Sequence, residues 1–321
     1  MNIDKTEKGV FYGIFAVILI GLQPIVANAR PAEIDAYIFA AFTISIEALI
    51  FLPIMVLERA NIKKSLKNEA KSKDKAGLLD GWKKNKLLLI YIGISFAIAQ
   101  VLFFIGYRLA GSINGSLTQK TTVIFGLLFG YLINNESVSI LQIIFSLVLF
   151  FGLALAITQG SFNVLEFNVG VLILLIMAII WMLAHAITKP IFDRNEATPS
   201  QMVFIRNAIG GIFLMFTYLI FYPASNFLMV FDPLNLFFFV IMGINYGVGL
   251  FFWYLVLKYL GTGKGTAMVS GTPLVTAIFA VLLLGEPFTL WHLIGMVIVI
   301  VSIIFIVRPQ KKSETIIYDE P

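Results

Sequence analysis

The chain has 321 residues, of which 59% are apolar and only 13% are charged, with a mean hydropathy of +0.93 and a formal net charge of +5. A soluble domain is roughly half apolar and about a quarter charged. This chain therefore has too few polar groups to cover a globular surface, which excludes a cytosolic enzyme, a secreted domain or a disordered tail and indicates an integral membrane protein. The absence of cysteine excludes disulfides, thiolate metal sites and cysteine nucleophiles.

Ten apolar runs follow one another along the chain, each close to the roughly 20 residues that a helix needs to cross a bilayer. Because the runs are continuous and do not alternate with a period of two, they favour helices over barrel strands. We therefore predict an all-α integral membrane fold. The predicted spans are Val10–Ala29, Tyr37–Leu57, Leu87–Leu109, Ser112–Ile133, Ile140–Thr158, Val169–Thr188, Met202–Phe221, Leu236–Leu257, Thr266–Leu284 and Leu290–Val307.

Most connections between these runs are short, and the long exception is the segment 58–86, which is rich in Lys, Asn, Glu and Ser. Its composition predicts a mobile loop. The first run admits a second interpretation, because Lys8, an apolar stretch and Ala27-Asn28-Ala29 resemble a signal peptide with its cleavage site. We favour a retained helix, since its removal would leave nine spans.

The basic residues predict the orientation of the chain. If the N-terminus is cytoplasmic, 19 of the 23 Lys and Arg residues fall in cytoplasmic segments, ten of them between residues 58 and 86. Only Arg30 and Arg108 fall on the opposite face, and Lys120 and Arg206 lie inside spans. Positive charge collects on the cytoplasmic side of membrane proteins. We therefore expect a multi-pass protein of the cell membrane with both termini in the cytoplasm.

The chain contains an internal repeat, because residues 107–146 align without gaps with residues 257–296. The break between halves lies near residues 158–167, which predicts one five-helix unit over residues 1–160 and a second over 161–321. Since five is odd, the second unit enters from the opposite side of the membrane, as in the inverted repeats of secondary transporters. The aligned pairs include Gly111 with Gly261, Gly115 with Gly265, Thr122 with Thr272 and Glu136 with Glu286.

The second half contains several recognisable motifs, namely Gly285-Glu286-Pro287 with Gly295, Pro273, Trp181, and Arg206 seven residues after Pro199. Together these motifs resemble those of the EamA family of the drug/metabolite transporter superfamily. The first half departs from this pattern, with Val123, Ser137 and Phe145 at the positions of Pro273, Pro287 and Gly295. The resemblance covers the whole chain and implies a ten-helix bundle that moves small metabolites, commonly amino acids or related solutes.

Two ionisable side chains in the first half are the sharpest candidates for a binding site. Glu47 lies near the middle of the second span and Lys120 about eight residues into the fourth. Ionisable groups at membrane depth are costly and usually functional. Across a cavity, the two could bind the amine and the carboxylate of a zwitterion. Alternatively they form a structural ion pair, or Glu47 carries coupling protons.

Other candidates lie in the remaining spans. Arg206 is near the end of the seventh span, where it can extend its side chain to the membrane interface or bind substrate. For His185, near the end of the sixth span, we favour a hydrogen-bonded structural role over a proton relay. With no cysteine and no paired carboxylates nearby, we expect no metal site. The second tier comprises polar and aromatic residues that suit either a cavity wall or helix packing, namely Gln23, Gln100, Gln119, Trp181, Asn245 and Tyr246.

These patterns together predict a secondary transporter of small polar metabolites that works by alternating access. We expect the substrate to contact helices two, four, six, seven and eight, with membrane lipids and coupling protons as further partners and with no nucleic-acid partner or cofactor. The alternative substrates are hydrophobic or cationic drugs. A membrane-embedded enzyme is less favoured because no catalytic residues or motifs are present, and a channel because no repeated filter appears.

Overall fold

The computed structural model describes residues 5–68, 73–134, 138–162 and 168–306, and these residues form helices and no strands. The apolar runs of the sequence thus become helices, as predicted. The first half contains α1 (Lys5–Ala29), α2 (Ala36–Asn68), α3 (Lys73–Lys84), α4 (Lys86–Ala110), α5 (Ser112–Thr118), the 3-10 turn η1 (Gln119–Thr121), α6 (Thr122–Asn134) and α7 (Ile140–Ile157). The second contains α8 (Val169–Asp193), α9 (Pro199–Phe221), η3 (Ala224–Phe231), α10 (Pro233–Met268), η4 (Val269–Gly271), α11 (Thr272–Phe279), η5 (Ala280–Leu284) and α12 (Leu290–Ile306).

Eight helical segments of the described chain are long and apolar enough to cross a membrane, and they coincide with the first eight predicted runs. The last two runs correspond to shorter apolar segments, Val269–Leu284 and Leu290–Ile306. All ten predicted runs are therefore helical, as the sequence predicts. By length and hydropathy, eight of the described helical segments can cross a membrane.

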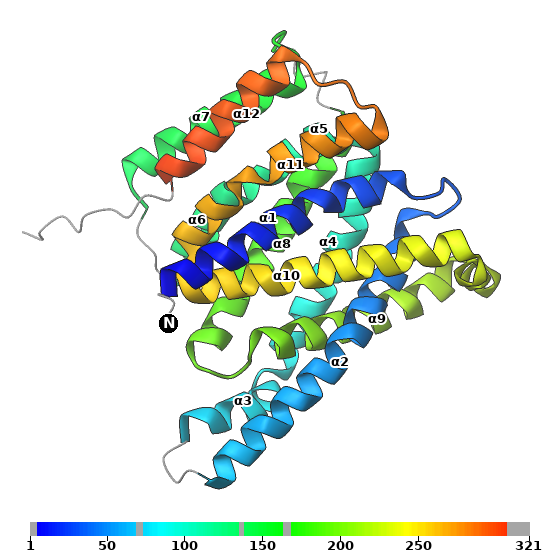
Figure 1. The fold of residues 1–321 in the computed structure, drawn as a ribbon, viewed down its shortest axis with the longest axis vertical. Coiled ribbons are helices and arrows are strands. Elements are labelled where there is room, and N and C mark those ends of the chain that lie inside the picture. Colours follow the sequence, from blue (N-terminus) through cyan, green and yellow to red (C-terminus); the bar gives the residue numbers. More distant parts are fainter. Residues whose placement is uncertain (1–4, 69–72, 135–137, 163–167, 307–321) are drawn as a thin grey trace, which may run out of the picture.

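The helices pack in pairs that recur between the two halves of the chain (Figure 1). Helix α1 lies between α10 and α11, and α8 packs in the same way against α4 and α6. Helix α2 packs against α9, and α7 packs against α12. Exchanging the elements of one half for their counterparts in the other therefore reproduces the same set of neighbours.

Glycines allow several of these helix pairs to approach closely. A Cβ atom at Gly170 of α8 would lie 2.5 Å from the backbone nitrogen of Ala110 and 2.7 Å from the carbonyl oxygen of Gly106 in α4. One at Gly295 of α12 would lie 2.5 Å from the carbonyl oxygen of Gly152 in α7. Backbone atoms cannot give way as a flexible side chain can, so these positions require glycine.

The described residues of the segment 58–86, which exclude 69–72, are helical where their composition predicts a loop, because α2 continues to Asn68 and residues 73–84 form α3. A backbone contact explains the ordering of α3. A Cβ atom at Gly81 would lie only 2.0 Å from the carbonyl oxygen of Glu196, and Gly77 faces Asn195 in the same way. In addition, Nη2 of Arg59 in α2 donates to the carbonyl oxygen of Leu79 at 2.8 Å. Tertiary contacts thus override the polar composition.

The predicted connection between the eighth and ninth runs is also helical, since α10 extends from Pro233 to Met268 without a break. The aligned position in the first half behaves differently. There α4 ends at Ala110 and Gly111 takes a φ of +80°, a conformation that glycine adopts without steric cost. The two halves therefore differ at the equivalent point.

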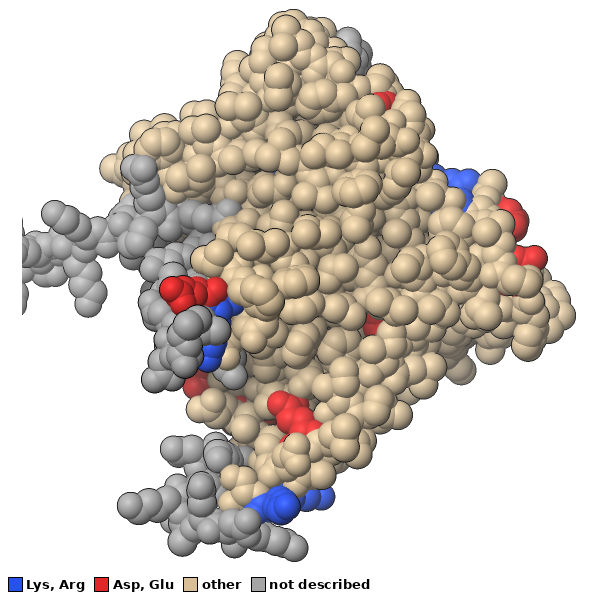
Figure 2. Space-filling view, viewed as in Figure 1, with Lys and Arg blue, Asp and Glu red and all other residues tan. Residues whose placement is uncertain are grey.

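The distribution of charge on the surface matches a protein that crosses a membrane. Figure 2 shows a broad surface with few charged side chains, and most of those in view lie towards its left and right margins. Many large apolar side chains are exposed between these margins, among them Leu147, Phe216 and Leu282. Such a surface is stable in contact with lipid.

Candidate solute-binding site

A buried carboxylate lies at the centre of the bundle, where α2, α4 and α9 meet. The side chain of Glu47 in α2 is fully buried. Its Oε1 accepts a hydrogen bond of 3.1 Å from Nε2 of Gln100 in α4, and its Oε2 accepts one of 2.8 Å from Nδ2 of Asn207 in α9. Each carboxylate oxygen thus has an amide donor, and hydrogen bonds to an ionised acceptor are the stronger kind.

The guanidinium of Arg206 lies beside this carboxylate, close enough to interact with it electrostatically. Arg206 is fully buried, so the prediction that it extends to the interface is wrong. Its Nε donates to Oδ1 of Asn207 at 3.1 Å and its Nη1 donates to the hydroxyl of Tyr254 at 3.4 Å. The guanidinium carbon lies 3.9 Å from the ring centroid of Phe96, a favourable cation–π contact.

Aromatic rings from α8 and α10 form a wall next to the guanidinium. Trp181 stacks on His185 and on Tyr246, with ring centroids 6.0 and 6.4 Å apart. His185 meets Phe96 and Tyr254 edge to face, at 4.8 and 6.0 Å. The structure therefore brings Trp181, His185 and Tyr246 into one cluster with Arg206, although they are distant in sequence.

Within the described residues, two buried donors of this cluster have no hydrogen-bond partner, namely Nη2 of Arg206 and Nε1 of Trp181. Oδ1 of Asn245, a buried acceptor that precedes Tyr246 in α10, has no partner there either. Buried polar atoms are nearly always satisfied, so each exception requires an explanation. Two donors and one acceptor without partners fit a region that receives a polar solute.

The structure does not join Glu47 to Lys120, so the structural ion pair, one of the alternatives for these two residues, is wrong. Lys120 lies in η1, and its Nζ donates to the carbonyl oxygen of Val269 in η4 at 3.0 Å. Within the described residues no carboxylate lies within ion-pair distance of this ammonium. Arg206 takes the place that the sequence analysis gave to Lys120, because α9 packs directly on α2.

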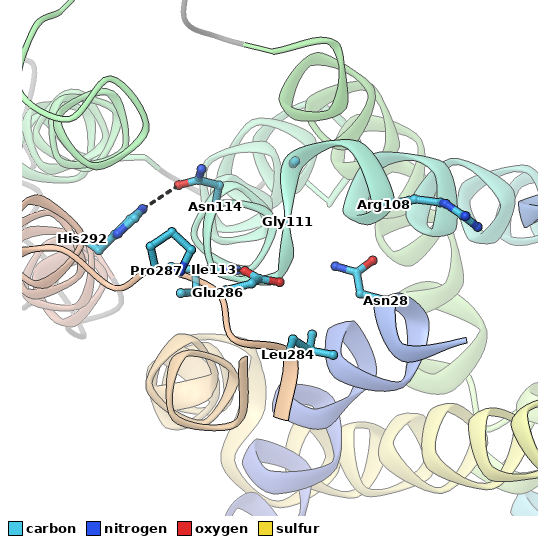
Figure 3. Close-up of a pocket in the computed structure, with 10 residues that line it drawn as sticks. Asn28, Arg108, Gly111, Ile113, Asn114, Leu284, Glu286, Pro287 and His292 are labelled. Carbon is cyan, nitrogen blue, oxygen red and sulfur yellow. Dashed lines mark hydrogen bonds between the residues drawn. The ribbon is translucent and has the colours of Figure 1, made fainter. Parts of the chain in front are cut away.

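A separate cavity of about 460 Å³ lies beside the break between α4 and α5 (Figure 3). Glu286 reaches this break from the connection after η5, and its carboxylate accepts hydrogen bonds of 2.8 to 3.0 Å from the backbone nitrogens of Ser112 and Ile113. It therefore caps the start of α5. The cavity is lined by Asn28, Arg108, Ala110, Gly111, Ile113, Asn114, Leu284, Glu286, Pro287 and His292. Glu136, the counterpart of Glu286, lies outside the described residues.

Two charged groups outside the spans have shifted pKa values. Burial, followed by repulsion from Arg108, lowers the pKa of Arg30 to about 10. Near α3, a hydrogen bond of 2.9 Å from Nδ2 of Asn85 lowers the pKa of Glu196, and Arg194 acts in the same direction. Glu196 thereby links the segment after α3 to the connection between α8 and α9.

Sequence reasoning missed three residues of the central cluster, namely Phe96, Asn207 and Tyr254. Asn207 follows Arg206 directly, and Tyr254 lies eight residues after Tyr246, so both stood at recognisable spacings. Phe96 carries no polar atom, and its contact with the guanidinium requires the fold. A search for polar residues adjacent to each buried charge would have found Asn207.

Comparison with known proteins bears on this arrangement. The family model of the EamA-like transporter family matches residues 7–158 and again residues 168–308. The chain belongs to this family. EamA membership, together with the apolar helices, makes the chain a multi-pass membrane protein and a transporter. This confirms the resemblance seen in the sequence.

Two further comparisons identify one protein of similar sequence and one solved structure of similar fold. An "Uncharacterized transporter" of Methanothermobacter thermautotrophicus is 22% identical over 302 residues, which cover 92% of this chain and 82% of the relative. A solved crystal structure superposes with a TM-score of 0.62 at 14% identity, covering 93% of this chain and 96% of the other. The latter likeness shows a shared fold.

Proposed function

We propose that this EamA protein is a secondary active transporter that carries small polar metabolites, amino acids or related solutes, across the cell membrane by alternating access. Family membership supports transport in general. The nature of the solute is inferred from the central cluster. The substrate contacts α2, α4, α8, α9 and α10, which supply Glu47, Gln100, Trp181, His185, Arg206, Asn245 and Tyr246.

The observation that carries this proposal is the set of buried polar atoms on α8, α9 and α10 that have no hydrogen-bond partner among the described residues. Leaving a buried donor or acceptor unpaired costs roughly 1–3 kcal/mol. A bound solute with both accepting and donating groups would recover this cost for Arg206, Trp181 and Asn245. Binding therefore favours a polar solute over a purely apolar one.

A cationic drug fits the cluster less well. Such a ligand needs a carboxylate that is not already compensated, and Glu47 accepts two amide hydrogen bonds and lies beside the guanidinium of Arg206. The neighbouring guanidinium would also repel a second cation. The aromatic wall alone favours apolar ligands, but the partnerless polar atoms would then remain unsatisfied.

The architecture that we propose has ten spans in two inverted five-helix units, residues 1–160 and 161–321, with both termini in the cytoplasm. Two matches of one family model support the division. The recurring helix pairs support a repeat, as do the 3-10 turns η1 and η4, which begin 150 residues apart at Gln119 and Val269. The excess of basic residues in the predicted cytoplasmic segments supports the orientation.

An inverted repeat gives alternating access a physical basis. Two similar units in opposite orientations can exchange their conformations, which converts an inward-open cavity into an outward-open one of similar energy. A solute that binds both states then needs to shift the equilibrium only slightly. The driving force is the solute gradient, exchange against a second solute, or a proton gradient.

Solute counterflow in proteoliposomes tests this proposal. The variant Trp181→Phe keeps the ring but removes Nε1, which has no partner in the protein. We expect wild-type vesicles preloaded with a solute to accumulate the labelled form, and this variant to lose most of the uptake while its melting temperature stays unchanged. Trp82→Phe, on the exposed α3, is the matched control. Failure of every amino acid and organic acid to drive counterflow would refute the function.

A further inference from the structure

The buried ammonium of Lys120 has no role in the cluster described above. Its side chain is only 7% exposed, and among the described residues its one hydrogen-bond acceptor is the carbonyl oxygen of Val269. An ammonium can donate three hydrogen bonds. A buried cation with one neutral partner is costly, because nothing on the protein side compensates its charge.

The charges deep in the bundle do not balance within the described spans. The carboxylate of Glu47 lies beside the guanidinium of Arg206, so these two charges compensate each other. Lys120 lies apart from this pair, and within the described residues its ammonium donates to the neutral carbonyl of Val269 and forms no ion pair. The protonated side chain is therefore a cation without a counter-charge in the described part of the chain.

The surroundings of Lys120 suit a ligand. Lys120 belongs to the first half of the chain and Val269 to the second, so the ammonium lies where the two halves meet. Directly after η4, α11 begins with Thr272, whose buried hydroxyl oxygen has no hydrogen-bond partner among the described residues. Beside Lys120, Gln119 accepts a hydrogen bond of 3.0 Å from Tyr107. A polar subsite with one uncompensated cation thus lies between η1 and η4.

We propose that the solute of this transporter is a small organic anion whose carboxylate pairs with Lys120, so that the loaded bundle is electrically balanced. The proposal rests on the transport function given above and names the charge of its substrate. A zwitterion would leave the surplus positive charge in place, whereas a monocarboxylate removes it. A phosphate dianion would exceed the single charge available.

Aromatic side chains connect this subsite to the central cluster. Tyr107 packs on Phe103 with ring centroids 4.5 Å apart, and Phe103 meets Tyr246 at 5.7 Å. Tyr246 in turn stacks on Trp181. The body of the anion would lie along these rings, with its carboxylate at Lys120 and its polar substituents towards the partnerless atoms of Trp181 and Asn245.

Thermal stabilisation of the purified full-length protein in detergent measures binding with probes that differ in one group. L-Lactate and L-alanine share a skeleton and differ in charge, as do 3-phenyllactate and phenylalanine, and lactamide is the neutral counterpart. We expect at least one of the hydroxy acids to raise the melting temperature, and its amino-acid and amide counterparts to do so at concentrations at least about tenfold higher.

Variants assign the effect to Lys120. Lys120→Met keeps the apolar stem and should weaken carboxylate binding about tenfold or more, Lys120→Arg should retain part of it, and Lys83→Met, on an exposed lysine, should behave as wild type. If zwitterions or cations stabilise the wild type and drive counterflow while the hydroxy acids do not, the anion proposal is wrong and the transport function stands. Unchanged carboxylate binding by Lys120→Met would overturn it equally. Loss of counterflow with every solute would instead refute the transport function.

Discussion

Removal of the Glu47 carboxylate should destabilise the bundle strongly. Glu47→Ala leaves the amide donors of Gln100 and Asn207 without their acceptor, and the guanidinium of Arg206 without the neighbouring negative charge, in a fully buried site. Removing one member of a buried charged pair costs about 3–5 kcal/mol. We therefore expect Glu47→Ala to lower the free energy of unfolding by about 4 kcal/mol.

The isosteric variant separates the hydrogen bonds from the charge. Glu47→Gln keeps one accepting oxygen for Gln100 or Asn207, but its new amide group faces the other donor. One charge-assisted hydrogen bond is then lost, and such a bond contributes about 1.5–3 kcal/mol. The expected loss of stability is therefore about half of that for alanine.

Equilibrium unfolding in mixed micelles of dodecylmaltoside and sodium dodecyl sulfate, followed by tryptophan fluorescence, measures both differences. Glu33→Ala provides the control, since Glu33 is exposed in the connection between α1 and α2 and should change stability by less than about 0.5 kcal/mol. If Glu47→Ala also stays within about 0.5 kcal/mol of wild type, the carboxylate does not organise the three helices and the argument is wrong.

Three further predictions follow from other contacts. Gly170→Ala would bring a Cβ atom within 2.5 Å of the backbone of α4 and should cost about 1–3 kcal/mol, whereas Gly126→Ala, which meets only the terminal methyl of Met182 at 3.1 Å, should leave the melting temperature almost unchanged. Because the folded protein lowers the pKa of Glu196, its contribution is present above the ordinary value of 4.5 and is lost as the pH falls through the folded value. The difference in melting temperature between wild type and Glu196→Gln should therefore be largest near neutral pH and vanish in acid, and a constant difference would contradict this. Since the chain has no cysteine, a single Ala110→Cys substitution can report on the cavity beside α5. Adding Glu286→Ala should speed the reaction of this cysteine with a charged thiol reagent about fivefold, which corresponds to about 1 kcal/mol of lost capping. An unchanged rate would show that the Glu286 cap does not hold the break between α4 and α5.

The sequence predicts the helices well because a bilayer permits little else. Long apolar runs must satisfy their backbone hydrogen bonds internally, so hydropathy alone located all ten helical segments. It failed at the segment 58–86, where Gly77 and Gly81 dock α3 on the backbone of residues 195 and 196. A contact between segments more than 100 residues apart leaves no periodic signal in either.

The candidate site was predicted by residue type but not by pairing. Glu47 and Gln100 lie together, and Trp181, His185, Arg206 and Tyr246 form the adjoining cluster. The sequence favoured Lys120 as the partner of Glu47 because Lys120 lies deep in its span and Arg206 near the end of its own, and because the sequence does not show which helices are neighbours. The contact between α2 and α9 joins the two halves, and it decides the pairing.

The central claim is that solute passes between two units of opposite orientation, and cysteine accessibility tests it most directly. Single cysteines at Val138, after α6, and at Phe288, after η5, occupy equivalent points of the two aligned halves. Labelling of intact cells with a membrane-impermeant maleimide should modify Phe288→Cys and leave Val138→Cys unmodified until the cells are lysed. Labelling of both positions in intact cells, or of neither, would place them on one side of the membrane and contradict the inverted arrangement.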